Sequence, residues 1–224
     1  PQLLAAVFMA LAGSISVHVL TDKKEFSLWY LIAAVPMGLS PYFLECFSYK
    51  YDSAVMGLSV LFSVLPLLYA SVSEKKYILI TLLCTACMCM SYQASAGIFP
   101  ILVVLICYRR WLDGEAFGKI CRFALVSAAG YLSGMLLFRL GIMTAISTHA
   151  SSDMPALDAL LPSMIRTYKT FLKHYLTDFK VEWHLFIVVL GCCFLYASCR
   201  TSLRPKAAAL VLGVPVLLII AALS

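Results

Sequence analysis

The segment 41–53 gathers several groups that could bind or activate a sugar or a phosphate. Glu45 and Asp52 bring carboxylates, which accept hydrogen bonds from sugar hydroxyls and can act as general bases. Lys50 brings a positive charge that suits a phosphate. Aromatic rings that could stack on a sugar face, and further hydroxyl groups, complete the set: Tyr42, Tyr49, Tyr51, Ser48 and Ser53.

The same segment also has a purely structural interpretation. Tyrosines collect at the boundary between lipid and water, and Asp52 or Ser53 could cap the helix that follows. Polar side chains close to a membrane are costly unless they pair or carry a function. Both interpretations therefore stay open at this point.

Two other places offer polar groups beside apolar runs. In the joint 91–95, Tyr92 and Gln93 could hydrogen-bond a ligand or a neighbouring helix. Arg139 lies inside an apolar run, where an arginine needs an anion, a carbonyl group or water. It could hold the phosphate of a lipid-linked substrate, or its long side chain could reach the lipid headgroups.

Residues 151–183 carry apolar side chains at steps of three and four, which predicts a helix. Arg166, Lys169 and Lys173 fall together on another face of that helix. We expect a basic amphipathic helix on the membrane surface, broken or restarted at Pro162. Such a helix could guide an anionic lipid carrier, or it could only cover the mouth of a helix bundle.

The composition requires membrane helices to position these groups. The 224 residues are 62% hydrophobic and only 12% charged, about half the usual charged share of a soluble domain. The mean hydropathy is +0.94. A span needs roughly 20 apolar residues, so the apolar runs predict an all-α, polytopic bundle of about eight spans. The predicted spans are 2–20, 28–44, 54–72, 77–92, 95–108, 121–145, 184–199 and 206–223.

The fourth and fifth of these runs allow a second interpretation. Each is short, and the polar joint between them is brief. They could form one long helix with a kink at Pro100 instead of two helices.

The loops between the spans give the bundle a direction. Eleven of the seventeen Lys and Arg residues fall in one alternate set of loops, and five fall in the other set. Because basic residues favour the cytoplasmic side, we expect segments 45–53 and 146–183 to face away from the cytoplasm. The chain opens at Pro1 without a visible signal peptide, so we expect an internal segment of a longer protein.

Several other classes of function have no support in the sequence. Most of the nine cysteines lie in apolar runs, where cysteine behaves as a small hydrophobic residue. The sequence contains no phosphate-cradling glycine loop and no hydrolase or metalloprotease motif. The net charge of +6 mostly reflects the inner loops, so we expect no nucleic acid partner. We expect no cofactor and no metal ligand set, and a metal requirement stays open.

The polar segment resembles a known family. Residues 41–45, 47–53 and Met56 are similar to a segment of the GtrII-type glucosyltransferases, which modify O-antigen and related surface polysaccharides. The joint 91–95 and the opening residues 1–4 look like further segments of that family. The resemblance covers about the first half of the chain.

This resemblance implies a GT-C-like, multi-pass glycosyltransferase of the bacterial inner (plasma) membrane, with its active face outside the cytoplasm. Such an enzyme moves a hexose, here glucose, from a polyprenyl phosphate to an acceptor glycan such as O-antigen. The family chemistry is an inverting displacement in which a carboxylate activates the acceptor and cations hold the leaving phosphate. Metal is optional in that scheme, and membrane lipid is the remaining partner.

The resemblance also implies roles for particular residues. The base of GT-C enzymes generally lies in the first outer loop, so residues 1–224 would be a single transmembrane domain that lacks its first span and that loop. That base would then be absent and the catalytic residue unknown, with Glu45 and Asp52 as catalytic candidates and as second-rank candidates for substrate binding. Lys50 and Arg139 would face the phosphate. The other candidate substrate-binding residues are Tyr49, Tyr51, Ser53, Tyr92 and Gln93.

Two other classes of protein stay open. A transporter or flippase of lipid-linked sugars would share the polar outer face, but it would also need access from the inside. No acid or base lies deep in a predicted span to line such a path. A non-catalytic membrane subunit of a polysaccharide assembly system is the third possibility.

Overall fold

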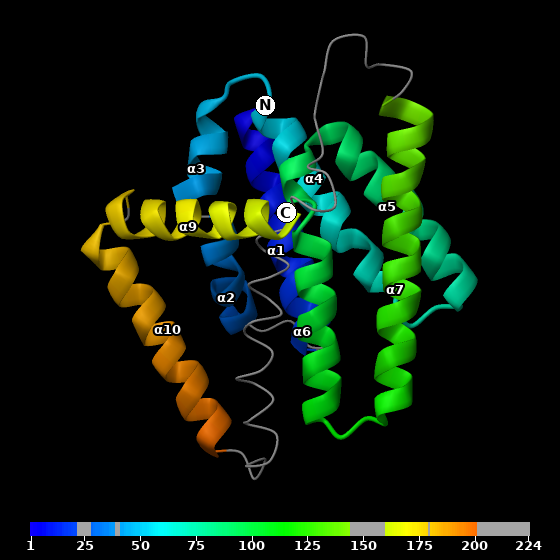
Figure 1. Cartoon of the computed structure of the whole chain (residues 1–224). Helices are drawn as coiled ribbons and strands as arrows, with labels where there is room; N and C mark the ends of the chain where they lie inside the picture. The colour runs from blue at the N-terminus through cyan, green and yellow to red at the C-terminus, as the bar shows by residue number, and fades with distance from the viewer. Residues whose placement is uncertain (22–27, 39–40, 144–159, 179, 201–224) are drawn as a thin grey trace. The chain divides into compact units, whose positions relative to one another are not determined.

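The computed structural model describes residues 1–21, 28–38, 41–143, 160–178 and 180–200 (Figure 1). The regular elements of these residues are all helices, and no β-strand occurs among them, which confirms the predicted all-α class. The chain divides into two compact units, Pro1–Ala150 and Ser151–Leu223.

Short helices joined by brief turns make up the first unit. Its described elements, in chain order, are α1 (Gln2–Thr21), α2 (Leu28–Gly38), α3 (Pro41–Ser48), α4 (Ser53–Val64), the 3-10 turn η1 (Leu65–Tyr69), α5 (Glu74–Ser91), the 3-10 turn η2 (Gln93–Ser95), α6 (Ile98–Leu112), α7 (Phe117–Leu137) and the π-helical turn η3 (Phe138–Met143).

The helices of the first unit run back and forth between two ends (Figure 1). The hairpin end contains the turn 49–52 between α3 and α4, the joint 92–95 between α5 and α6, and η3. The arginine end contains the last turn of α1, η1, and the connection from α6 to α7. Polar segments far apart in the sequence therefore lie at the same end of the unit.

The pair α5 and α6 settles the choice between two helices and one kinked helix. The chain turns at Tyr92, whose backbone is extended at φ −159° and ψ 109°, and α6 starts again at Ile98. Pro100 falls in the first turn of α6, where a missing backbone N–H costs little. Two separate helices are confirmed.

The core of the first unit lies where α1, α4, α5, α6 and α7 meet. Met9, Val64 and Phe99 are buried in it. The ring of Tyr77 is 2% exposed, and its hydroxyl lies 2.9 Å from the hydroxyl oxygen of Ser127 on α7. Inside a membrane, apolar burial alone does not hold helices together, so close packing and interhelical hydrogen bonds of this kind carry more of the association.

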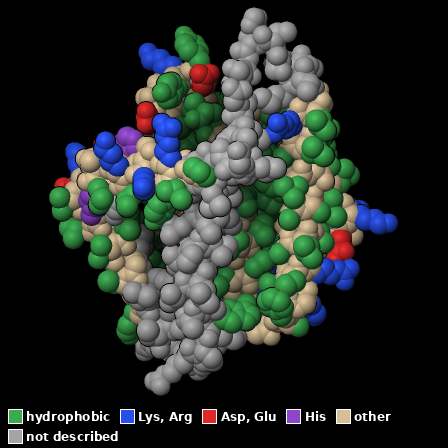
Figure 2. All heavy atoms as spheres, in the orientation of Figure 1, with side chains coloured by type: hydrophobic (Ala, Val, Ile, Leu, Met, Phe, Trp, Pro, Cys, Tyr) green, Lys and Arg blue, Asp and Glu red, His purple; other side chains and the backbone are tan. Residues whose placement is uncertain are grey.

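Three helical stretches in the described residues are long and apolar enough to cross a membrane: Gln2–Thr21, Gln93–Trp111 and Phe117–Ile142. Ser53–Tyr69 and Val181–Cys193 are shorter apolar helices. Figure 2 shows hydrophobic side chains over the outer side of α7, where Leu125 is 71% exposed. These features indicate a membrane protein.

The predicted count of about eight spans is not confirmed, because three helical stretches of the described residues have the length and apolarity of a span. The predicted span 28–44 forms two helices, α2 and α3, and the predicted span 206–223 lies outside the described residues. The predicted spans 54–72, 77–92 and 184–199 coincide with helices that are shorter or less apolar than a typical span.

The second unit contains α9 (Leu160–Asp178) and α10 (Val181–Arg200). The helix predicted within 151–183 is present as α9, and Pro162 lies in its first turn, where proline is tolerated. Arg166, Lys169 and Lys173 are exposed. The apolar residues Ile165 and Leu176 of α9 are exposed as well, at 53% and 63%. Both faces of the amphipathic pattern are thus accessible within this unit.

A local pair at the end of α9 fixes His174. Its Nδ1 lies 2.7 Å from a carboxylate oxygen of Asp178, one helical turn away. The Thr177 hydroxyl donates to the other carboxylate oxygen at 2.8 Å. The hydrogen bonds from Thr177 and His174 hold the pKa of the Asp178 carboxyl below its usual value.

Candidate functional site

The turn between α3 and α4 is short and closed by its own backbone. The N–H of Tyr49 donates to the carbonyl of Cys46 at 3.3 Å, and the N–H of Ser53 donates to the carbonyl of Tyr49 at 3.1 Å. The hydroxyl of Ser48 donates to the carbonyl of Glu45 at 2.7 Å. Because the backbone bonds are made within the turn, its acidic and basic side chains stay available for other contacts.

The charged side chains of this turn are exposed. Glu45, Lys50 and Asp52 all lie on the surface, and Tyr51 is 87% exposed. Tyr49 is 49% exposed. Two carboxylates and one ammonium group therefore face outward from a segment of eight residues at the hairpin end.

The structure tests the idea that Asp52 or Ser53 serves only to cap α4. Asp52 occupies the N-cap position, but its side chain makes no capping hydrogen bond. Ser53 is 1% exposed, and its buried hydroxyl has no hydrogen-bond partner among the described residues. Helix capping therefore does not explain the carboxylate of Asp52. Ser53 is buried among the helices of the first unit.

The joint 92–95 lies beside this turn. Tyr92, 37% exposed, follows the last residue of α5. Partial burial, followed by the nearby negative forms of Cys46, Tyr49 and Glu45, raises the pKa of the Tyr92 phenol. Burial and the neighbouring Glu45 carboxylate likewise raise the pKa of the Cys46 thiol. The turn 45–53 and the joint 92–95, both predicted from the sequence, therefore lie close enough for their ionisable groups to affect one another.

A group of buried serines, Ser59, Ser63 and Ser95, fixes the joint against α4. The hydroxyl oxygens of Ser59 and Ser95 lie 2.6 Å apart, and the hydroxyl of Ser63 donates to the carbonyl of Ser95 at 3.2 Å. All three serines are less than 5% exposed. The sequence analysis did not identify Ser59 and Ser63. Their spacing of four residues, which places them on one helix face, was the available signal.

A second contact holds the joint from the other side. The hydroxyl of Tyr131 on α7 donates to the carbonyl of Ala96 at 2.8 Å, and its ring stacks on Phe99 with a centroid distance of 5.5 Å. The joint is therefore anchored to both α4 and α7. Gln93, at its start, is exposed and available to a ligand.

Arg139 lies in the π-helical turn η3 that follows α7, at the hairpin end, and its side chain is exposed. π-Helical turns are rare and are frequent at functional sites. The structure therefore places Arg139 at the same end of the unit as Glu45, Lys50 and Tyr92.

An apolar groove of about 470 Å³ lies between α1, α2 and α3. Met9, Val35, Leu44 and Phe47 are among its lining residues. Its α3 wall leads directly to the polar turn, because Leu44 and Phe47 flank Glu45 in the chain. The amide group of the Gln2 side chain donates to the carbonyl of Phe47 at 2.8 Å and ties the start of α1 to this wall.

In the part of the chain that the structure describes, no three His, Cys, Asp or Glu side chains lie close enough together to hold a metal ion. The polar groups that lie at the hairpin end are carboxylates, phenols, an amide and two cations. They suit hydrogen bonds to sugar hydroxyls, proton transfer and the neutralisation of a phosphate.

Three apolar helical stretches of membrane length define a helical membrane protein, and its polar candidate site lies at one end of the first unit. The model of the family described as glucosyl transferase GtrII matches residues 1–224, and the chain therefore belongs to this family. Membership supports a role in glucosyl transfer, and it confirms along the whole chain the resemblance first seen in its polar segments. Neither the curated proteins nor the solved structures gave a significant match.

Proposed function

We propose that the hairpin end is where glucose passes from a polyprenyl-phosphate donor to an acceptor glycan such as O-antigen, outside the cytoplasm. The observation that carries this proposal is that segments 45–53 and 92–95 lie close together. In the described residues, the exposed carboxylates of Glu45 and Asp52 form neither a capping hydrogen bond nor an ion pair. A structural turn would need neither carboxylate.

The apolar groove supports a lipid-linked donor. Its lining is mostly apolar, and it reaches α3 beside Glu45. A polyprenyl chain could lie in this groove while its phosphate and sugar reach the polar turn, because apolar surface buried against an apolar chain is favourable. A nucleotide-sugar donor would instead need a cradle for its diphosphate, and the sequence contains no such glycine loop.

The proposed reaction is a single displacement at the anomeric carbon of glucose. A carboxylate, Glu45 or Asp52, takes the proton of the acceptor hydroxyl as its oxygen forms a bond to that carbon. The bond from the carbon to the phosphate oxygen breaks, and the polyprenyl phosphate leaves with the electron pair. Lys50 and Arg139 stabilise the charge that develops on the leaving phosphate.

The remaining polar residues of the hairpin end bind the sugars in this scheme. Tyr49, Tyr51 and Tyr92 offer rings and hydroxyls, and Gln93 offers an amide that both donates and accepts. Ser53 lies beneath them with an unpartnered hydroxyl, so it contacts a substrate only if the turn opens. The excess of basic residues in the opposite loops supports a plasma membrane protein with this end outside.

Incubation of the purified full-length protein with polyprenyl-phosphate glucose and an acceptor glycan tests the proposal. We expect glucose to leave the lipid and appear on the acceptor, and UDP-glucose not to replace the lipid donor. If glucose stays on the lipid but crosses the bilayer of a proteoliposome, the protein is a flippase and the proposal is wrong. Use of UDP-glucose alone would contradict the assigned donor.

A further inference from the structure

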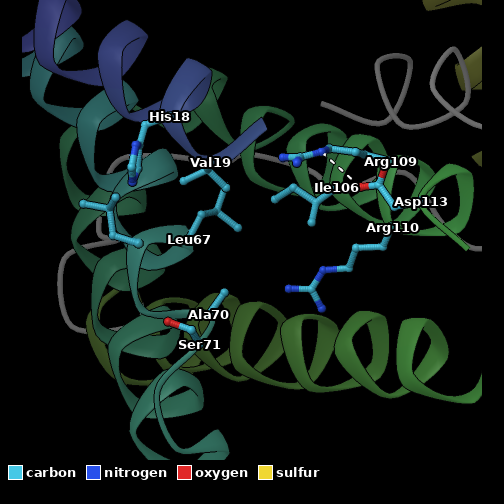
Figure 3. Close-up of a pocket in the computed structure, with 10 residues that line it drawn as sticks. His18, Val19, Leu67, Ala70, Ser71, Ile106, Arg109, Arg110 and Asp113 are labelled. Atoms are coloured by element: carbon cyan, nitrogen blue, oxygen red, sulfur yellow. Dashed lines mark ion pairs between the residues drawn. The ribbon is translucent and has the colours of Figure 1, made fainter. Parts of the chain in front are cut away.

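A second polar cavity lies at the arginine end of the first unit, opposite the hairpin end. Its volume is about 210 Å³. Three elements line it: α1 with His18, η1 with Leu67, and the last turn of α6 with Arg109 and Arg110 (Figure 3). Glucosyl transfer at the hairpin end uses none of these residues.

Arg109 forms the fixed wall of this cavity. Its side chain donates to the carbonyl of Leu20 at 2.6 Å, and its Nε lies 3.4 Å from a carboxylate oxygen of Asp113. These contacts tie the end of α6 to the last turn of α1. They hold the guanidinium in one place before any ligand arrives, which lowers the entropy lost on binding.

Arg110 is held differently and keeps its terminal nitrogens available. Its guanidinium lies over the ring of Phe123 on α7, 4.2 Å from the centroid, and its Nε lies 3.8 Å from Glu115. In the residues that the structure describes, neither terminal nitrogen of Arg110 has a hydrogen-bond acceptor. Figure 3 shows Arg109 extending from α6 toward the end of α1, and Arg110 extending toward the side of the cavity where Ala70 and Ser71 lie.

The lining of the cavity offers guanidinium N–H donors to an anion. Two arginines line it with one acid, Asp113, and a second acid, Glu115, lies 3.8 Å from Arg110 outside the lining. A guanidinium presents paired N–H groups that match two oxygens of a phosphate. The terminal N–H groups of Arg110 therefore suit the oxygens of a phosphate group.

The position of the cavity agrees with the depth of lipid headgroups. It lies at the ends of the apolar stretches Gln2–Thr21 and Gln93–Trp111. Tyr108 and Trp111 form an aromatic pair there, with a centroid distance of 6.2 Å. Tyrosine and tryptophan are enriched at the boundary between a membrane and water.

From these observations we infer that the cavity at the arginine end binds a phosphate group, through Arg109 and Arg110. The phosphate can come from an anionic phospholipid headgroup or from free phosphate. This inference does not rest on glucosyl transfer, because it concerns the other end of the unit.

Native mass spectrometry of the purified, delipidated full-length protein tests it. Phosphatidylglycerol and phosphatidylcholine with the same acyl chains are titrated, because they differ in headgroup charge. We expect phosphatidylglycerol to bind about tenfold more tightly, which corresponds to about 1.4 kcal/mol. Arg110→Gln should abolish this preference. Arg122→Gln should keep it, because Arg122 lies near the same end but pairs with Glu74 outside the cavity.

Three further observations complete the test. Arg110→Lys should keep part of the preference, because it retains the charge and loses the paired donors. A monodisperse elution profile shows that each variant is folded.

Inorganic phosphate that displaces phosphatidylglycerol identifies a site open to free phosphate, and failure to displace it identifies the lipid as the source. Equal binding of the two lipids, without an effect of inorganic phosphate on the thermal unfolding temperature, would overturn the inference. An equal loss of the preference for phosphatidylglycerol in Arg110→Gln and Arg122→Gln would also overturn the inference.

Discussion

Asp52 and Ser53 are neighbours at the start of α4, yet their environments are opposite. In the described part of the chain, the carboxylate of Asp52 is exposed and makes no capping hydrogen bond, whereas the hydroxyl of Ser53 is buried without a hydrogen-bond partner. An exposed, uncommitted carboxylate can meet a substrate, but a buried hydroxyl contributes mainly to packing. At this turn, Asp52 is a candidate functional residue because its side chain is exposed, and Ser53 is a packing residue because its side chain is buried.

The hydroxyl pair of Ser59 and Ser95 yields a prediction at the scale of single residues. Ser95→Ala removes this hydrogen bond, while the Ser59 hydroxyl keeps its bond to the carbonyl of Met56 at 2.7 Å, so we expect a loss of about 0.5–1.5 kcal/mol in the free energy of unfolding. The double variant with Ser59→Ala should lose less than the sum of the two single variants, because the hydrogen bond between the two side chains is then counted once. Unfolding in mixed micelles measures these values.

A matched control for this cycle is Ser91→Ala, because the Ser91 hydroxyl bonds only the carbonyl of Cys87 in its own helix. We expect little change in that variant. Strict additivity of Ser59→Ala and Ser95→Ala would show that the pair does not stabilise the joint.

The sequence allowed the polar groups of the site to be predicted, but not their supports. Glu45, Lys50 and Tyr92 were predictable because charged and phenolic groups are unusual between apolar runs. Ser59 was not, because a serine on an apolar helix is compatible with any neighbour. Its role depends on the packing of α4 against the joint, which requires the three-dimensional arrangement.

At the scale of elements, the contact between α5 and α7 depends on two glycines of α7. A Cβ atom added at Gly134 would lie 2.6 Å from the carbonyl oxygen of Leu82, and one at Gly130 would lie 2.8 Å from the Cβ of Thr81. Small residues four positions apart let membrane helices approach closely. The spacing of the two glycines can be read from the sequence, but the helix that they contact cannot.

We predict that Gly134→Ala destabilises the protein by about 1–3 kcal/mol, because the backbone of α5 must move away. Gly118→Ala is the control, since a Cβ there meets nothing within 4 Å. Thermal unfolding of both purified variants in detergent makes the comparison. Equal stability would show that α5 and α7 do not pack as closely as described.

The amphipathic helix α9 carries a prediction about membrane binding. A peptide of residues 160–178 should become helical on vesicles that contain anionic lipid. Replacement of Arg166, Lys169 and Lys173 by Gln should weaken this binding by about 1 kcal/mol for each charge removed. Circular dichroism and vesicle sedimentation follow the two effects. Equal binding of both peptides to anionic vesicles would exclude an electrostatic role for this face.

Along the whole chain, apolar runs alternate with short polar loops, and the basic residues are distributed unevenly between the two alternate sets of loops. The order of the described helices follows the predicted runs closely, because long apolar segments separated by charged turns leave few alternatives. The number of spans was less predictable. The run 28–44 is apolar throughout most of its length, yet it forms the two short helices α2 and α3.

The direction of the bundle can be measured in cells. We expect Lys50→Cys to react with an impermeant maleimide from outside, because most basic residues lie in the opposite loops and basic residues favour the cytoplasmic side. Lys119→Cys should react only after permeabilisation, and the unmodified protein provides the background of native cysteines. Labelling of Lys119→Cys in intact cells would reverse the proposed orientation.

The central claim is that the carboxylates of the hairpin end take part in glucosyl transfer. Its most direct test is the rate of glucose transfer from polyprenyl-phosphate glucose by purified full-length Glu45→Gln, Asp52→Asn and Glu74→Gln variants. We predict a loss of about 10²-fold or more in at least one hairpin variant, as expected for removal of a general base. Glu74→Gln, at the arginine end, should keep the wild-type rate. Wild-type rates in both hairpin variants would contradict the claim.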